Sequence, residues 1–374
     1  MRGYADIKCE NMKTTGTYLA LRDISVIFSP FEHRKLNLPT RLVMRPMARL
    51  LAQNGIPTPE MLRYYRRRAE HQIGLIVTEP VTIDDSAAAA DSGMAQFCGG
   101  AALRAWKGIC RAVHATPCKI APQLCHVGML RPASGDIPNP ASPAIGPSGI
   151  DPVTREKRGE TMSRERIRSV VQSFATAAAH ARLLGFDAVE INGGSACLPE
   201  QFMRPETNLR TDEYGGSLES RLRFVLEILH AVRKVAGRRF PVIFRFAQYS
   251  PGWESVPLAA SPAELERMLN ALCEAGVDIF ACDDAGVERP AFHGSAMNLA
   301  GWVRMLTHRP VITGGGVGVE YGIQGTVRRF MAHECDLVSV GRALLADAEW
   351  GSKILLAREK EITPYTERAW SRLF

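Results

Sequence analysis

The sequence has few of the features that mark metal-binding, disulfide-stabilised or membrane proteins. Its nine cysteines are scattered, with no C-x-x-C pair and no Cys/His cluster, which argues against a zinc site and against a disulfide framework. No apolar run approaches the roughly 20 residues that span a bilayer, and the N-terminal segment lacks the apolar core of a signal peptide. We therefore expect no metal, no membrane association and a reducing cytoplasm.

A dinucleotide-binding fingerprint is also missing, because no G-x-G-x-x-G follows an apolar strand, and a Rossmann domain is not expected. The formal net charge of +7 does not by itself indicate a nucleic-acid partner. The densest basic cluster, Arg63 with residues 66–68, lies in an expected helix and is interpreted as a solvated face. We expect no nucleic acid, and the positive charge suits the steering of anionic phosphate cofactors.

What the sequence does contain is a regular alternation of short apolar runs with helix-like segments, as expected for parallel strands buried on both faces. Helix starts are marked by Pro59 after Thr58, by Ser163, and by Ser261 with Pro262. The pattern predicts an α/β fold, a single-domain (β/α)₈ TIM barrel. The eight apolar runs are residues 41–44, 75–79, 119–124, 188–191, 242–246, 279–282, 310–313 and 337–340.

Two segments depart from the alternation. Residues 1–22 are expected to form an N-terminal extension, so that the barrel comprises residues 23–374. Residues 130–160, between the third strand and its helix, are rich in Pro, Gly and Ser. In a barrel this connection lies on the C-terminal face, so it is a candidate cap over an active site.

Residues at the C-terminal ends of barrel strands are the ones that reach a ligand, and several candidates follow the expected strands. Taken singly, each has a structural explanation: a glycine pair forms ordinary turns, a glutamine can be a core amide, and an arginine can belong to a buried ion pair. The candidates are Pro46, Met47 and Ala48 after the first strand, Pro80 after the second, Gln123 in the third, Arg245 in the fifth, Gly315 and Gly316 after the seventh, and Gly341 and Arg342 after the eighth.

The most informative stretch is residues 184–224, which reads LGFDAVEINGGSACLPEQFMRPETNLRTDEYGGSLESRLRF. It resembles the signature region of the Old Yellow Enzyme family of FMN-dependent oxidoreductases, V-E-[IL]-H-x-A-[NH]-G-Y-L-x-x-Q-F followed by N-x-R-T-D-x-Y-G-G. The resemblance runs from about residue 25 to the C-terminus. It implies FMN as cofactor, held by the candidates above, and NAD(P)H as co-substrate, and family members often form homo-oligomers.

The resemblance also implies which residues face the substrate, and here the chain departs from the family. Asn192 stands at the first His, Ser195 at the second His or Asn, and Cys197 at the Tyr that usually protonates the substrate. Asn192 and Ser195 can still donate hydrogen bonds, but neither carries a proton as His does. Cys197 is open between proton donor, nucleophile and inert apolar residue.

Two cofactor positions differ as well. Ala48 replaces the Thr or Cys that usually bonds the flavin O4, and Pro80 offers no backbone N–H. Both changes predict a flavin potential below ordinary family values.

Four functions are compatible with these residues. The first is hydride transfer between flavin N5 and an activated C=C of a small molecule. The second is a tailoring enzyme that dehydrogenates or isomerises its substrate, because the usual donors are replaced. The third is a non-catalytic flavin-binding barrel, and the fourth is a flavin barrel acting on RNA.

Overall fold

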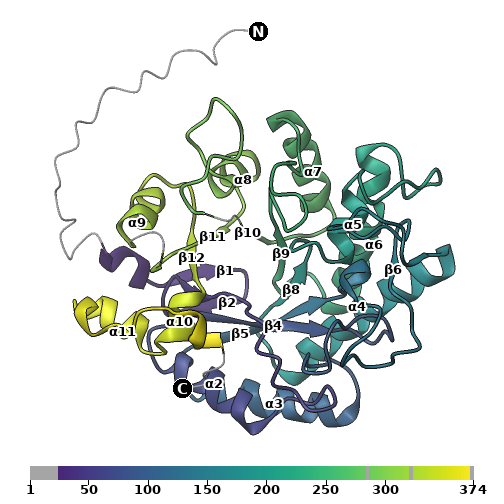
Figure 1. The fold of residues 1–374 in the computed structure, drawn as a ribbon. Helices are drawn as coiled ribbons and strands as arrows, with labels where there is room; N and C mark the ends of the chain where they lie inside the picture. Colours follow the sequence, from purple (N-terminus) through teal and green to yellow (C-terminus); the bar gives the residue numbers. More distant parts are fainter. Residues whose placement is uncertain (1–23, 284–285, 320–322, 371–374) are drawn as a thin grey trace.

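The computed structural model describes residues 24–283, 286–319 and 323–370. Eight parallel strands close into a barrel, each hydrogen-bonded to the next along the chain (Figure 1). Every apolar run singled out in the sequence is one of these strands, so the predicted single-domain (β/α)₈ barrel is confirmed. The strands are β3 (Leu42–Met44), β4 (Leu75–Thr82), β5 (Lys119–Cys125), β8 (Val189–Asn192), β9 (Val242–Phe246), β10 (Ile279–Asp283), β11 (Val311–Gly314) and β12 (Leu337–Val340).

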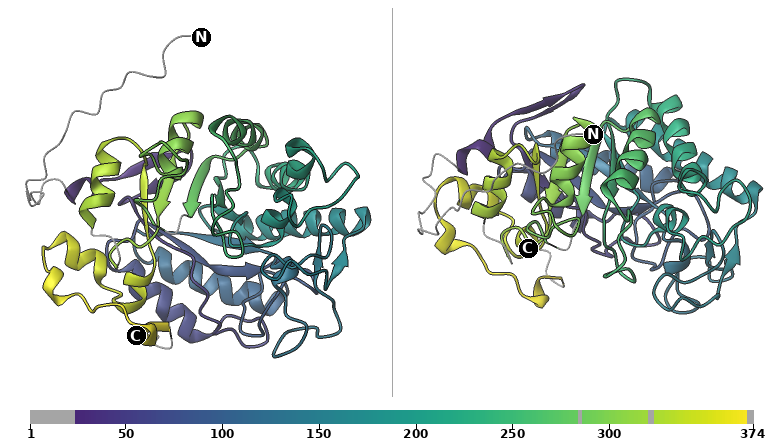
Figure 2. Two further views of the ribbon diagram at one scale, coloured as in Figure 1. Left: turned by 45° about the horizontal axis from the view of Figure 1, so that its top comes forward. Right: turned by 90° about the horizontal axis from the view of Figure 1, so that it is seen from above.

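Helices surround the barrel, and the C-terminal segment, yellow in Figure 2, lies on its periphery. The Ser163 hydroxyl accepts a hydrogen bond from Arg166 N and the Ser261 hydroxyl accepts one from Glu264 N, so these two expected N-caps are formed. The expected helix with Pro59 in its first turn is also present, but its N-cap residue, Thr58, makes no side-chain capping hydrogen bond. The helices are α2 (Pro59–Ala69), α3 (Gly100–His114), α4 (Arg164–Leu184), α5 (Leu198–Met203), α6 (Leu218–Ala236), α7 (Pro262–Glu274), α8 (Leu299–Thr307), α9 (Ile323–Met331), α10 (Arg342–Ala346) and α11 (Trp350–Leu355), with 3₁₀ turns η1 (Ser25–Phe28), η2 (Gly128–Leu130), η3 (Glu359–Glu361) and η4 (Glu367–Trp370).

A hairpin that precedes the barrel closes its N-terminal end. It consists of β1 (Phe31–His33) and β2 (Leu36–Leu38), paired antiparallel. Phe31, Leu36 and Leu38 are buried in one cluster with the apolar side chains inside the barrel, contributed by the strand residues Val43, Leu75, Val77, Ala121, Ile243, Ile279, Ala281, Ile312 and Leu337. The bottom of the barrel is therefore an apolar plug, and a ligand site is expected at the opposite end.

Side chains alternate along each strand between the barrel interior and the layer of helices. In β9, Ile243 lies in the interior cluster and Phe244 packs in the outer core, so Arg245 points inward again. Because the other strands alternate in the same way, a set of their side chains points into the C-terminal mouth of the barrel. They are Arg45, which follows β3, and Gln123, Cys125, Glu190, Asn192 and Asp283.

The predicted excursion after β5 is present and is held by a buried arginine. Arg131 donates hydrogen bonds to the carbonyl oxygens of Ala89, Pro138 and Asn139. Two short parallel strands, β6 (Ile145–Gly146) and β7 (Glu160–Thr161), order the rest of the segment.

The basic stretch of α2 is only partly a solvated face. Arg63 and Arg66 are exposed and pair with acidic residues on the same helix. Arg68, however, is buried: its guanidinium lies 3.7 Å from the ring centroid of Tyr64 and donates to Leu344 O. The interpretation from sequence is therefore wrong for Arg68, which ties α2 to α10.

The expected N-terminal extension, residues 1–22, lies outside the described residues, and the boundary of the barrel at residue 23 stays a prediction. Among the described residues, no helix has both the length and the apolar character to cross a membrane.

Candidate active site

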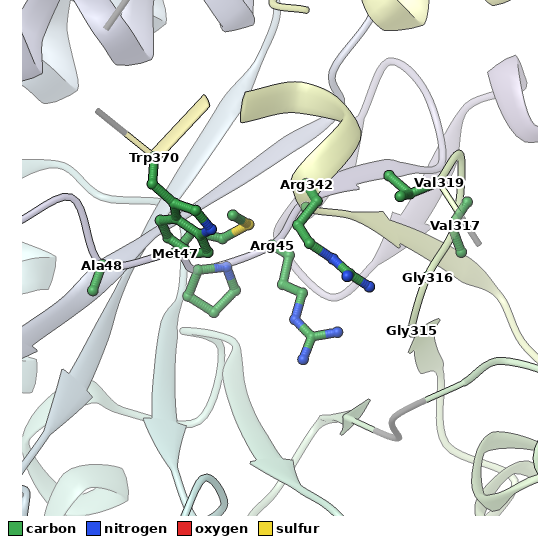
Figure 3. A pocket seen from close by; sticks show the side chains of 11 residues that line it. Arg45, Met47, Ala48, Gly315, Gly316, Val317, Val319, Arg342 and Trp370 are labelled. Carbon is green, nitrogen blue, oxygen red and sulfur yellow. The ribbon is translucent and has the colours of Figure 1, made fainter. Parts of the chain in front are cut away.

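A cavity of about 390 Å³ opens at the C-terminal mouth, between the segments that follow β3, β11 and β12 (Figure 3). It gathers most of the cofactor residues expected from the sequence, although they come from opposite ends of the chain. Those lining residues are Pro46, Met47, Ala48, Gly315, Gly316, Gly341 and Arg342, joined by Arg45, Val317, Val319 and Trp370.

Two glycines of this cavity are required by their backbone conformation. Gly315 and Gly316 have φ angles of 128° and 70°, a backbone region that residues with a Cβ rarely adopt. A Cβ on Gly341 would lie 2.7 Å from the Met47 sulfur. The guanidinium groups of Arg342 and Arg45 point into the space that this glycine loop faces (Figure 3). The Arg342 guanidinium opposite a glycine backbone fits an anionic phosphate group, whereas Arg45 is paired with Asp283.

A second part of the mouth is a buried chain of hydrogen bonds centred on Glu190. Its Oε1 accepts from Gln123 Nε2 and from Arg245 Nε, each at 2.7 Å. All three side chains are at most 2% exposed. The carboxylate therefore fixes both the amide and the guanidinium in orientation, and together they can bond the edge of a heterocycle.

The chain of charges continues to two residues that the sequence reasoning missed. Arg245 Nη1 lies 3.3 Å from Asp283 Oδ2, and Asp283 also pairs with Arg45. Arg45 and Asp283 in turn line a second cavity of about 300 Å³, next to Ser195 and Tyr249. The alternation of side chains along β3 and β10 could have predicted them, because Arg45 and Asp283 continue the inward-facing rows of Val43 and Ala281.

The three candidate catalytic residues are not all brought together. Asn192 Nδ2 lies 3.5 Å from Cys197 Sγ and 3.4 Å from Gln123 Oε1, so these two candidates meet beside the Glu190 chain. Ser195 is exposed, has a φ of 55°, and faces the second cavity.

Cys197 has a further neighbour that the sequence did not single out. Its sulfur lies 3.4 Å from the sulfur of Cys125, at the end of β5. The hydrogen bond with Cys125, together with burial, raises the pKa of the Cys197 thiol well above its ordinary value.

Pro80 lies in β4 opposite Gln123, where the pairing with β5 slips out of register. The preceding residue, Glu79, is 2% exposed, and its carboxylate accepts hydrogen bonds from Arg49 N and the Tyr65 hydroxyl. Burial raises the pKa of Glu79 from 4.5 to about 7. Glu79 thus supports the segment that carries Ala48.

The excursion of residues 130–160 contributes no side chain to the lining of either cavity and packs beside α5 instead. Its role as a cap stays a prediction.

Comparisons with known proteins agree with this geometry. The model of the NADH:flavin oxidoreductase / NADH oxidase family matches residues 26–361. The metal reductase of Desulforamulus reducens is 31% identical over 351 residues, which cover 91% of this chain but only 50% of that relative. The NADPH dehydrogenase of Halalkalibacterium halodurans is 28% identical and is covered over 98% of its length, with 92% of this chain.

Among solved structures, morphinone reductase in complex with tetrahydroNAD superposes with a TM-score of 0.80 and 26% identity, covering 92% of this chain and 93% of that one. The expected FMN cofactor is confirmed at the level of the family. The chain belongs to the NADH:flavin oxidoreductase / NADH oxidase family, the Old Yellow Enzyme family of FMN-dependent oxidoreductases.

Proposed function

We propose that this chain transfers a hydride between the N5 of bound FMN and an activated C=C of a small molecule, with NAD(P)H as the reductant. The observation that carries the proposal is the joining of two sites at one barrel mouth. The glycine-lined cavity with Arg342 suits the phosphate, and the Glu190 chain presents Gln123 and Arg245. FMN carries a phosphate at one end and the isoalloxazine ring at the other, so it needs both of these sites.

Within the proposal, the cofactor residues divide into two groups. Gly315, Gly316, Gly341 and Arg342 hold the phosphate through backbone N–H groups and one guanidinium. Gln123 and Arg245 bond the pyrimidine edge of the ring, while Pro46, Met47, Ala48 and Pro80 border it. The positive Arg245 stabilises negative charge at that edge, although Asp283 and Glu190 partly offset it. When bound, FMN supplies the hydride-transfer chemistry.

On the substrate side, Asn192 and Ser195 are the proposed donors to the acceptor oxygen, and Cys197 stands where a proton donor is expected. The raised pKa of Cys197 makes its thiol a weak acid at neutral pH. The thiol therefore stays protonated at neutral pH, the state that a proton donor needs, and solvent is the alternative source of the proton.

A second candidate is favoured by the same contacts. The Asn192 amide is engaged with Gln123 and Cys197, so an enone carbonyl would have to compete for it. Dehydrogenation or isomerisation of a substrate that develops no oxyanion would leave these contacts of the Asn192 amide intact.

A panel of α,β-unsaturated carbonyl compounds and nitroalkenes separates the two candidates. With NAD(P)H and the holoenzyme under anaerobic conditions, the first proposal predicts reduction of the C=C with stoichiometric consumption of the nicotinamide. Reduction of the flavin by NAD(P)H without turnover of any such acceptor would refute it and support the second candidate.

We also propose the cytoplasm as the compartment. The cysteines of the described residues are all free thiols, which is compatible with reducing conditions.

A further inference from the structure

Two buried thiols meet at the mouth of the barrel. Cys125 is the last residue of β5, Cys197 is the N-cap residue of α5, and their sulfurs are 3.4 Å apart. They are 1% and 5% exposed and lie in a small apolar cluster with Ala89, Met94 and Val127. The two residues are 72 positions apart in the chain, and the pairing of β5 with β8 brings them together.

The pair belongs to the reaction site and not to the general core. The Asn192 amide is 3.5 Å from the Cys197 sulfur and 3.8 Å from the Cys125 sulfur, and it also contacts Gln123. Cys125 shares the inward-facing row of β5 with Gln123, which is held by Glu190 at the proposed flavin edge. Cys125 therefore lies two positions along β5 from Gln123, and the Asn192 amide connects both thiols to Gln123.

The distance suits a covalent bond. A disulfide requires the sulfurs to approach to about 2.05 Å, and rotations of both side chains about their Cα–Cβ bonds supply movement of this size. Burial keeps bulky external disulfides away, and the raised pKa of Cys197 disfavours attack on them by a thiolate. The oxidant or reductant must then be a group already inside the mouth.

We propose that Cys125 and Cys197 form a redox-active dithiol that exchanges an electron pair with the bound flavin. In the oxidation, both S–H bonds break and one S–S bond forms. The electron pair and the two protons pass to oxidised flavin, which becomes reduced. In the reverse direction, the electron pair of reduced flavin and two protons cleave the disulfide and restore both thiols.

The site gives the enzyme a second two-electron centre next to the first. The proposal rests on the family's flavin but on no particular substrate. It therefore holds whether the enzyme reduces, dehydrogenates or isomerises its substrate.

An anaerobic dithionite titration tests the proposal, on holoenzyme previously oxidised with excess ferricyanide, which withdraws electrons through the flavin and is then removed. The wild type should take up about four electrons per flavin, two for each centre, whereas the variants Cys197→Ser and Cys125→Ser should take up about two. Cys118→Ser is the matched control, since Cys118 is also buried but donates to the Lys119 carbonyl oxygen away from the mouth, and it should behave as the wild type. Neither NAD(P)H nor an alkene is needed, so failure of the proposed reaction does not affect the result.

Differential alkylation followed by peptide mass spectrometry provides the second readout. The oxidised wild type should yield a linked Cys125–Cys197 peptide pair that disappears on reduction. Uptake of about two electrons by the wild type, with both cysteines still alkylated after oxidation, would overturn the proposal, and so would a linked pair that adds no electrons to the titration. If a serine variant fails to fold, Cys197→Ala provides the same comparison.

Discussion

Replacing Glu79 with glutamine should remove a pH dependence from the stability of the barrel. The carboxylate is buried, and its pKa is raised from 4.5 to about 7 in the folded protein. Below pH 4.5 it is protonated in both states. Between 4.5 and 7 the unfolded chain ionises while the folded protein does not, so the free energy of unfolding falls as pH rises through this window.

The size of the effect follows from the two pKa values. At about 1.4 kcal/mol per pH unit, the difference between the two pKa values corresponds to about 3 kcal/mol of unfolding free energy. The wild type loses this full amount only above pH 7. A glutamine can keep the contacts, because its oxygen can accept from Arg49 N and its amide can donate to the Tyr65 hydroxyl oxygen. The free energy of unfolding of Glu79→Gln, relative to that of the wild type, should therefore increase by about 3 kcal/mol between pH 4.5 and pH 8.

Urea unfolding followed by circular dichroism at several pH values measures this difference. Glu219→Gln is the control: the amide N–H of Glu219 itself lowers the pKa of this exposed carboxylate, so its contribution should move in the opposite direction with pH. A wild type–Glu79→Gln difference that stays constant from pH 4.5 to pH 8 would refute the assignment of a neutral buried acid beside the cofactor segment.

Three further substitutions probe the cofactor site. Gly316→Ala should cost about 1–2 kcal/mol in stability because its φ is 70°, and should weaken FMN binding in a fluorescence titration; Gly237→Ala, with a φ of 79° at the end of α6, should cost as much and leave binding unchanged, and equal binding losses in both would contradict the phosphate role. Arg342→Met should weaken FMN about 10- to 100-fold while barely affecting riboflavin, because a hydrogen bond to a charged group contributes about 1.5–3 kcal/mol; equal losses for both flavins would exclude a phosphate contact. Ala48→Thr should raise the flavin potential by about 20 mV, the equivalent of one hydrogen bond of about 1 kcal/mol in a two-electron couple, and an unchanged or lower potential in a redox titration would count against the flavin O4 contact.

The fold could be predicted from the sequence because each strand is a short apolar run whose two faces are both buried. Ser163 and Ser261 mark helix starts by local chemistry alone, since a hydroxyl and an N–H three residues later suffice. The hairpin of β1 and β2 was not predicted. Its residues form a strand pair only because the open bottom of the barrel offers an apolar surface to Phe31 and Leu36.

Part of the candidate site could likewise be predicted from the sequence, and part could not. Gly315, Gly316 and Arg342 follow strands directly, so their place at the barrel mouth follows from topology, and the structure brings them into one cavity. The Arg45–Asp283 ion pair joins β10 to the segment after β3, which is not its neighbour in the barrel, and the Cys125–Cys197 contact joins the end of β5 to the start of α5. Neither contact could be predicted, because the distance between the side chains depends on how the strands pair in three dimensions. Only the inward parity of these residues was available in the sequence.

The central claim is that the mouth of this barrel binds FMN and accepts a hydride from a nicotinamide. Anaerobic titration of the purified holoenzyme with NADH and with NADPH, followed at the flavin absorbance, tests it most directly. The account predicts a yellow protein that bleaches with about one equivalent of nicotinamide per flavin centre, and with a second equivalent when the disulfide is present. A protein that binds FMN but stays oxidised in excess NADH and NADPH would contradict it.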